Sequence, residues 1–367
     1  MPAMSGHRFL VVTWEGGGNL TPVMGLGPQL LARGHTVAVL ARESLRGRVE
    51  ALGMGFVPQT SAGWLPTAAD LLTAVEADPP DALVVDFMLP SALSAAERTG
   101  LPTAALVHTL YAPVADNTFP AIEMEGPVGP LNELRADLGL PSVDRVVDVL
   151  DRARRVIAVT TAGFDGPAVV VHPHARYVGP VLEGAGADDG WTPPFPAGDD
   201  RPLVVVSMGT TPMDEGPVLR HVLSALGELP VRVVAQVGEH VDADALPQAD
   251  NLVVTGYVRH AAVLPHTSVV VTHAGLGTVS SALAHGVPMV CIPLGRDQPL
   301  TAARVEAVGA GRVVSPDAPA DDIAAAVADI VGDPTYADAA AVQARDITAC
   351  IDGQLAVRAV EQVVAVP

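Results

Sequence analysis

The stretch Ser268–Thr301, SVVVTHAGLGTVSSALAHGVPMVCIPLGRDQPLT, decides the fold of this chain. Its first part, Val269–Thr272, is a run of apolar and β-branched residues that is typical of a buried parallel strand. A glycine turn follows, and Thr278 as N-cap with Gly286 just past the last turn predicts a short helix between them. A second apolar strand, Met289–Ile292, comes next. Strand, helix and strand in this order predict an α/β fold with a parallel sheet.

The turn between the first strand and the helix is suited to binding phosphate. Gly275 and Gly277 let the backbone approach a ligand without a Cβ in the way. The helix that follows offers unpaired N–H groups and the positive end of its dipole, and both favour an anion. His273 at the end of the strand and Thr278 each add one hydrogen-bond donor. These four residues form a candidate phosphate site.

A second polar turn follows the second strand and contains Asp297 and Gln298. We expect it at the same edge of the sheet, because the carboxyl ends of parallel strands meet there. A carboxylate and a side-chain amide together supply acceptors and a donor, which suits a ligand with several hydroxyl groups. A phosphate site beside a group that binds hydroxyls predicts a nucleotide sugar as the ligand.

The segments HAGLGT, HGVP and DQP follow one another between His273 and Pro299. Together they resemble the donor motif of GT-B glycosyltransferases of the UDP-glycosyltransferase superfamily, in particular bacterial enzymes that glycosylate macrolides and other natural products. The resemblance implies two Rossmann-like domains that face each other across a cleft. It also implies that Gly209 and Thr210 approach the phosphates and that Val258 lies where plant relatives stack a tryptophan on uracil. Valine offers little stacking surface, so the choice between a uridine and a thymidine donor stays open.

The N-terminal half begins with the apolar run Arg8–Thr13 and a glycine-rich loop that reads Gly18-Asn19-Leu20-Thr21-Pro22. Related enzymes carry Gly-His-x-x-Pro in this loop, and the histidine is their general base. Asn19 occupies that position here, and an amide cannot take up a proton at a useful pH. Asn19 is therefore expected to position the acceptor, although an asparagine beside three glycines is equally expected for conformational reasons.

Three other residues are candidates for the general base. Asp86 follows the predicted strand Ala82–Val85 and matches the aspartate that supports the histidine in related enzymes, which makes it the first choice. An aspartate at a strand end is, however, also a common helix cap. His108 follows the predicted strand Thr103–Val107 and is the second choice, since it is expected at the same edge of the sheet. Glu15, in the glycine-rich loop, is the third.

The order of predicted elements divides the chain into two α/β domains and a final helix. Residues 1–181 are the expected acceptor-binding domain, with Arg155–Thr160 as its last strand. Residues 182–201, which are rich in Gly, Asp and Pro, are the expected linker. Residues 202–345 are the expected nucleotide-sugar-binding domain, and residues 346–367 are expected to form a helix that packs back on the first domain.

The composition excludes several classes of protein. A formal net charge of −20 over 367 residues argues against nucleic acid or an anionic membrane as a partner. The chain has no apolar run of membrane-spanning length and no signal segment at Met1–His7, so we expect a cytoplasmic protein without a membrane anchor. Cys291 and Cys350 are too few for a disulfide framework. No cluster of His and Cys has metal-ligand spacing, so neither a metal nor a cofactor is expected.

These observations predict an inverting, metal-independent glycosyltransferase of the hexosyltransferase type. It would move a sugar from a TDP- or UDP-linked donor to a small, largely apolar aglycone such as an antibiotic or another natural product, as a monomer or a homodimer. Two alternatives stay open. Asn19 favours a catalytically weak or inactive accessory protein that binds a nucleotide sugar, and a nucleotide-sugar 2-epimerase would also use two such domains.

Overall fold

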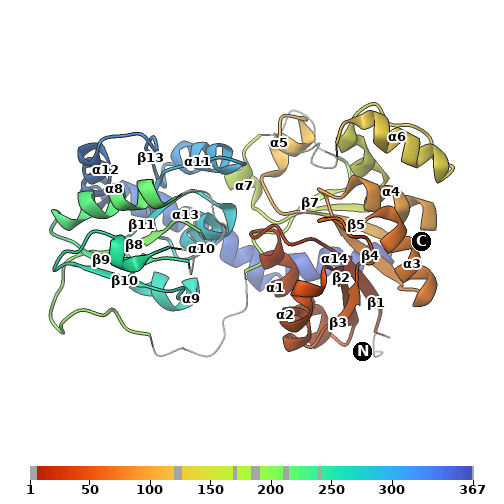
Figure 1. Ribbon diagram of the computed structural model, residues 1–367, viewed down its shortest axis with the longest axis horizontal. Coiled ribbons are helices and arrows are strands. Elements are labelled where there is room, and N and C mark those ends of the chain that lie inside the picture. The colour runs from red at the N-terminus through yellow and green to blue at the C-terminus, as the bar shows by residue number, and fades with distance from the viewer. Residues whose placement is uncertain are drawn as a thin grey trace. The chain divides into compact units, whose positions relative to one another are not determined.

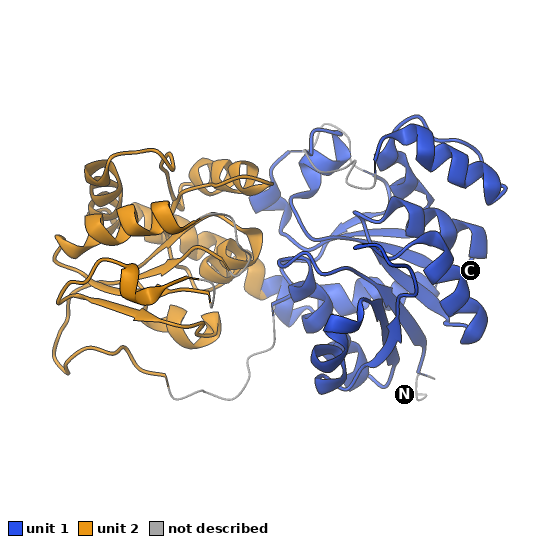
Figure 2. Ribbon diagram, in the orientation of Figure 1, with its two compact units in different colours: residues 1–183, 349–367 blue, residues 184–348 orange. Residues whose placement is uncertain are grey.

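The computed structural model describes residues 6–119, 126–167, 172–182, 191–209, 215–238 and 241–365. The chain forms two compact units, Met1–Glu183 with Ala349–Pro367 and Gly184–Thr348 (Figure 2). Thr210 and residues 183–190 of the expected linker lie outside the described residues. Leu182 belongs to the first unit and residues 191–201 belong to the second, where the Trp191 and His266 rings lie 5.7 Å apart.

The first unit is built on a seven-stranded sheet with the order β3-β2-β1-β4-β5-β6-β7, in which every pair is parallel. Its strands are β1 (Arg8–Val12), β2 (Thr36–Ala41), β3 (Gly55–Pro58), β4 (Ala82–Asp86), β5 (Thr103–Val107), β6 (Arg155–Ala158) and β7 (Ala175–Tyr177). The prediction that Arg155–Thr160 is the last strand is wrong, because β7 pairs outside it. Three residues are too few for a recognisable pattern of apolar alternation.

Helices cover both faces of this sheet (Figure 1). The helices of the first unit are α1 (Leu20–Ala32), α2 (Arg46–Ala51), α3 (Ala68–Ala77), α4 (Pro90–Thr99), α5 (Tyr111–Ala115), α6 (Val128–Asp137), α7 (Ala162–Asp165) and α14 (Leu355–Ala365), with 3-10 turns η1 (Glu43–Leu45) and η2 (Val146–Arg152). Local signals set the bounds of α4, since Pro90 stands at its first position and Gly100 ends it in the left-handed conformation at φ 70°.

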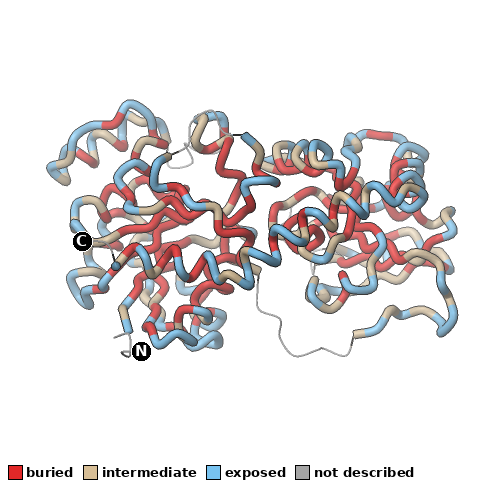
Figure 3. The backbone as a smooth tube through the Cα atoms, turned by 180° about the vertical axis from the view of Figure 1, so that it is seen from behind, coloured by how far each residue is buried: buried red, intermediate tan, exposed pale blue. Residues whose placement is uncertain are grey.

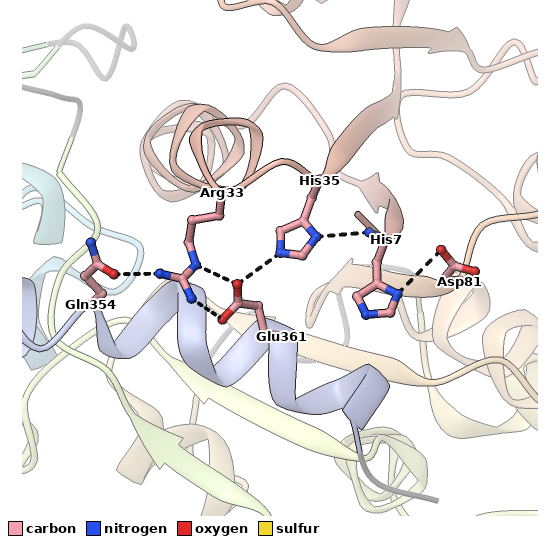
Figure 4. A network of polar contacts seen from close by, with 6 residues as sticks. All are labelled: His7, Arg33, His35, Asp81, Gln354 and Glu361. Atoms are coloured by element: carbon pink, nitrogen blue, oxygen red, sulfur yellow. Dashed lines mark hydrogen bonds and ion pairs between the residues drawn. The ribbon is translucent and has the colours of Figure 1, made fainter. Parts of the chain in front are cut away.

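The final helix α14 belongs to the first unit. Its apolar side chains, among them Val357, Val360 and Val363, join β1, β2, β4 and α1 in one buried core. The Glu361 carboxylate accepts hydrogen bonds from Arg33 at 2.6 and 3.0 Å and lies 3.0 Å from Nε2 of the buried His35 (Figure 4). Both apolar packing and this polar network therefore hold the end of the chain against the start of the same unit.

The second unit repeats the arrangement with a six-stranded parallel sheet in the order β10-β9-β8-β11-β12-β13. Its strands are β8 (Leu203–Ser207), β9 (Arg232–Gln236), β10 (Leu252–Thr255), β11 (Val269–Thr272), β12 (Met289–Cys291) and β13 (Gly311–Val313). Its helices are α8 (Gly216–Gly227), α9 (His260–Val263), α10 (Leu276–Ala284), α11 (Gln298–Ala307), α12 (Ala320–Gly332) and most of α13 (Pro334–Asp352), with η3 (Ala243–Ala245) and η4 (Leu264–His266). Among the described residues, no helix combines the length and the apolarity that a membrane span requires.

Buried residues follow the strands of both units (Figure 3). The strand order changes direction between β1 and β4 in the first unit and between β8 and β11 in the second. Ligands of open parallel sheets bind at such points, outside the carboxyl ends of the strands. These two places are therefore where the functional residues are to be sought.

Candidate functional site

Three of the four residues predicted for the N-terminal half form one hydrogen-bonded cluster. Asp86 ends β4 and is only 2% exposed. Its Oδ1 lies 3.1 Å from Nε2 of His108 and accepts the backbone N–H of Met88 at 2.9 Å. Its Oδ2 accepts the side-chain amide of Asn19 at 3.3 Å. The cluster sits at the carboxyl ends of β4 and β5 and at the start of α1, beside the point where the strand order reverses.

The Asn19 side chain is used within this cluster and its loop. Besides Asp86, its amide nitrogen donates to the carbonyl of Trp14 at 2.8 Å and approaches Oγ1 of Thr13 at 3.4 Å. Its oxygen accepts the N–H of Gly16 at 3.1 Å. Asn19 is buried and makes no side-chain cap on α1. It therefore closes the glycine-rich loop and secures Asp86.

The geometry assigns a tautomer to His108. A carboxylate oxygen can only accept, so Nε2 of His108 carries the proton in its contact with Asp86. Nδ1 is then the basic nitrogen of the ring. The ring of Phe87 packs edge-on against the imidazole with centroids 4.9 Å apart and limits its rotation. A histidine oriented by a buried carboxylate can take up a proton and have the resulting charge stabilised.

Glu15, the third candidate base, lies apart from this cluster. Its Oε2 accepts a hydrogen bond of 2.7 Å from the Ser44 hydroxyl in the segment after β2. The side chain is half-buried, and its carboxylate is engaged by a neutral donor. Glu15 therefore ties the loop after β1 to the turn after β2.

The four residues predicted to bind phosphate gather at the start of α10. The helix begins at Leu276 with Gly275 as its N-cap, so the prediction of Thr278 as N-cap is wrong. Ala274 makes the turn at φ 66° and allows the helix to start earlier than the sequence suggested. Gly277 and Thr278 consequently lie in the first turn, where backbone N–H groups have no partner within the helix.

His273 is held between two glycines. A Cβ on Gly209 would lie 2.8 Å from Cε1 of the imidazole, and a Cβ on Gly275 would lie 2.6 Å from its Nε2. Burial lowers the pKa of His273, and a hydrogen bond with the backbone of Ser207 and the charge of Asp297 oppose this only partly. The ring is thus neutral near pH 7 and fixed beside the helix start.

Asp297 and Gln298 open the next helix, α11. Asp297 is its N-cap, and the buried Gln298 accepts the N–H groups of Leu294 and Gly295 through Oε1 at 2.7 and 3.1 Å. That oxygen therefore holds the turn between β12 and α11. Because β11 and β12 are adjacent and parallel, the two predicted turns that follow them lie at the same edge of the sheet.

Sequence reasoning missed two residues near this edge. Tyr257 precedes the half-buried Val258 and is 59% exposed, so an aromatic ring lies one position before the valine that was predicted to offer little stacking surface. Gln236 ends β9, and both polar atoms of its buried side chain lack a hydrogen-bond partner. Two features of the sequence could have identified them. Tyr257 is one of only four tyrosines in the chain, and Gln236 is a polar residue at the end of the apolar run of β9.

No group of three or more His, Cys, Asp or Glu side chains among the described residues could hold a metal ion. The polar clusters of both units are thus made of hydrogen-bonding groups around helix starts and strand ends. Such groups can orient hydroxyls, hold an anion and move a proton.

Comparisons with known proteins agree with this geometry. Residues 220–359 match the family described as the C-terminal domain of erythromycin biosynthesis protein CIII-like proteins. The 4'-demethylrebeccamycin synthase of Lentzea aerocolonigenes is 29% identical over 370 residues, which cover 83% of this chain and 87% of that protein. The glycosyltransferase of kitacinnamycin superimposes with a TM-score of 0.84 at 27% identity, covering 98% of this chain and 99% of its own.

A more distant structure, the spinosyn rhamnosyltransferase SpnG complexed with thymidine diphosphate, has the same fold. It superimposes with a TM-score of 0.71 at 22% identity and covers 93% of this chain and 96% of its own. The predicted fold class, two Rossmann-like units of the GT-B type, is confirmed by these superpositions. Over almost its whole length this chain is therefore similar to bacterial natural-product glycosyltransferases that have the GT-B fold.

Proposed function

We propose that this glycosyltransferase moves a sugar from a TDP- or UDP-linked donor to a small, largely apolar natural-product aglycone, with inversion at the anomeric carbon and without a metal ion or cofactor. The observation that carries the proposal is the His108–Asp86 pair secured by Asn19. It supplies a general base in a chain whose glycine-rich loop lacks the histidine of related enzymes.

The donor half acts on the leaving group. The first-turn N–H groups of α10 meet the diphosphate, and the dipole of the helix stabilises the charge that develops when the sugar departs. The ring of His273 stands beside this helix start, where its glycine neighbours fix its position. Asp297 and the amide of Gln298 bind the sugar hydroxyls. The complex of SpnG with thymidine diphosphate supports a diphosphate of this kind as the ligand.

The acceptor half acts on the nucleophile. Nδ1 of His108 takes the proton of the acceptor hydroxyl while the acceptor oxygen attacks the anomeric carbon. The bond between that carbon and the diphosphate breaks, and its electron pair leaves with the diphosphate. Asp86 then stabilises the imidazolium. His108 is preferred to Asp86 as the base because both Asp86 oxygens already accept hydrogen bonds and the side chain is almost completely buried. One direct displacement gives inversion.

Replacing the base tests this assignment. His108→Ala should lower kcat by roughly 10²- to 10⁴-fold while leaving the Kd for TDP or UDP in calorimetry unchanged. Asp86→Asn should lower kcat and also move the acidic limb of the pH profile to lower pH, since a histidine without a carboxylate neighbour loses its proton more readily. His221→Ala, on the exposed surface of α8, is the matched control. Undiminished turnover in His108→Ala would remove the proposal.

The stereochemistry and the metal requirement have separate tests. NMR of the product should show the anomeric configuration opposite to that of the donor, and excess EDTA should leave the rate unchanged. A donor sugar that changes configuration without any acceptor would indicate an epimerase. Nucleotide binding without transfer across a wide aglycone panel would indicate an accessory protein.

A further inference from the structure

A second buried carboxylate lies beside the loop that carries His108. Asp165 ends α7, follows β6 and is 3% exposed. Its Oδ1 accepts the backbone N–H of Tyr111 at 2.7 Å, and its Oδ2 accepts the N–H of Ala112 at 2.8 Å. The same Oδ2 accepts the hydroxyl of Tyr177, from the end of β7, at 2.7 Å. Three donors from two other segments thus converge on one side chain.

These contacts fix the point at which the His108 loop ends. Tyr111 is the first residue of α5 and follows His108 by three positions. Leu110, the N-cap of α5, has no side-chain group that could satisfy the helix start. Asp165 supplies that cap from the loop after the neighbouring strand, since β5 pairs with β6. The chain between β5 and α5, which contains His108, is therefore held at both ends.

The turn of α7 that carries Asp165 is itself held by hydrogen bonds. Thr161 caps α7 by accepting the N–H of Phe164 at 3.2 Å, which orients the single turn that carries Asp165. Burial and the hydrogen bond to Asp165 raise the pKa of Tyr177, so its hydroxyl remains a donor. Burying a carboxylate is costly unless its hydrogen bonds are made, and here the donors of Tyr111, Ala112 and Tyr177 lie 2.7, 2.8 and 2.7 Å from its oxygens.

We propose that Asp165 is a positioning residue for glycosyl transfer, which holds the loop after β5 so that Nε2 of His108 stays on Asp86. Asp86, His108 and Asp165 follow the adjacent strands β4, β5 and β6, so the base lies between its carboxylate partner and the carboxylate that fixes its loop. This proposal rests on the proposed role of His108 as the base. A loop that shifts by about 1 Å is enough to impair such a contact.

Asp165→Asn is the direct test. The amide nitrogen of asparagine cannot accept, so either the bond from Tyr111 or those from Ala112 and Tyr177 are lost. We expect kcat to fall by about 10-fold with the Kd for TDP unchanged. The acidic limb of the pH profile should move to lower pH, in the same direction as in Asp86→Asn, because the histidine loses its carboxylate contact.

Two further variants separate positioning from general stability. Asp70→Asn is the matched control, because Asp70 is also 3% exposed in the first unit and accepts the backbone N–H groups of Thr60, Ser61 and Thr67. It should lower Tm without changing kcat or the pH profile at a temperature where the protein is folded. Tyr177→Phe keeps both backbone bonds to Asp165 and should leave kcat within about 2-fold of the wild type.

The outcomes are distinguishable. If Asp165→Asn lowers Tm as Asp70→Asn does but keeps the wild-type kcat and pH profile, Asp165 is only structural and the inference is overturned. If too little Asp165→Asn folds, Thr161→Ala loosens the same turn and should move the acidic limb in the same direction by less; an unmoved limb also overturns it. Normal turnover in His108→Ala would instead remove the proposed function.

Discussion

The two sheets of this protein share a strand order but present different chemistry at equivalent places. In the first unit, the strands beside the reversal point lead into the linked side chains of Asn19, Asp86 and His108. In the second unit, β8 and β11 lead into Gly209 and into His273, whose ring the glycines enclose. One edge is built from paired ionisable groups and the other from backbone amides and a neutral ring.

This difference suits the two halves of a transfer reaction. Moving a proton requires a group that changes its charge, and a buried carboxylate partner stabilises that change. Holding a diphosphate requires dipoles that stay fixed while charge develops on the leaving group. The same topology thus delivers residues to equivalent places, and in the proposed reaction the few residues after each strand determine the task of each edge. The following predictions test that distinction.

The largest expected effect comes from filling the space beside His273. Gly275→Ala places a Cβ 2.6 Å from Nε2 of the ring and forces it to move. We expect the affinity for TDP or UDP to fall by about 10- to 100-fold in calorimetry. A Cβ on Gly277 would have no atom within 4 Å in the free protein. Any loss of affinity in Gly277→Ala therefore reports only how closely the diphosphate approaches the backbone. A wild-type Kd for Gly275→Ala would contradict the proposed binding of the diphosphate at the start of α10.

The stability of the second unit should depend on pH because the half-buried His260 is kept neutral. Burial and the nearby His285 lower the pKa of His260 to about 4. The unfolded chain binds this proton at higher pH, so the free energy of unfolding should fall between about pH 6.5 and pH 4, by up to ~1.4 kcal/mol per pH unit. Denaturant titrations at a series of pH values measure the free energy of unfolding. Its dependence on pH should be weaker for His260→Gln than for the wild type. Identical slopes in both proteins would be inconsistent with this origin.

A third prediction concerns the side-chain amide of Gln236, which has no hydrogen-bond partner at the end of β9. Gln236→Met should raise the free energy of unfolding by about 1–2 kcal/mol, because a buried polar group without a hydrogen bond is replaced by an apolar one of similar shape. Asn251→Leu is the contrasting variant. The Asn251 amide donates to the carbonyls of Leu226, Leu229 and Val231, so its removal should destabilise. A destabilised Gln236→Met would mean that the amide is satisfied in solution.

The smallest effect is expected at the turn before α10. Ala274 has φ 66°, which costs a residue with a Cβ about 1 kcal/mol, so Ala274→Gly should raise Tm slightly. The same change inside the helix, Ala282→Gly, should lower Tm because glycine is a poor helix former. Thermal unfolding of the two variants measures the sign of each change in Tm. Equal decreases in Tm would show that the backbone at Ala274 is relaxed.

The sequence predicted elements whose signals are local. The bounds of α4 follow from Pro90 and Gly100, and the donor residues lie in one contiguous motif. The predicted start of α10 was wrong because the conformation of Ala274 depends on its burial in the turn. β7 was missed because three residues carry too little pattern.

The cluster of the first unit was predicted only residue by residue. Asn19, Asp86 and His108 were each candidates, but their contact depends on β4 lying between β1 and β5, which is a property of the whole sheet. Asp165 was not predicted at all, since it reaches Tyr111 across 54 positions of sequence. Long-range side-chain contacts of this kind carry no local signature.

The position of α14 has a consequence for how the protein is made on the ribosome. The sheet of the first unit is synthesised early, yet Val357, Val360 and Val363 of its core come after residues 184–348. At 5–20 residues per second, roughly 10–30 s of translation separate the two parts. During that time the nascent sheet exposes the apolar surface that α14 will cover. A chain that is truncated before α14 therefore keeps this apolar surface exposed, and chaperones and proteases recognise such a surface.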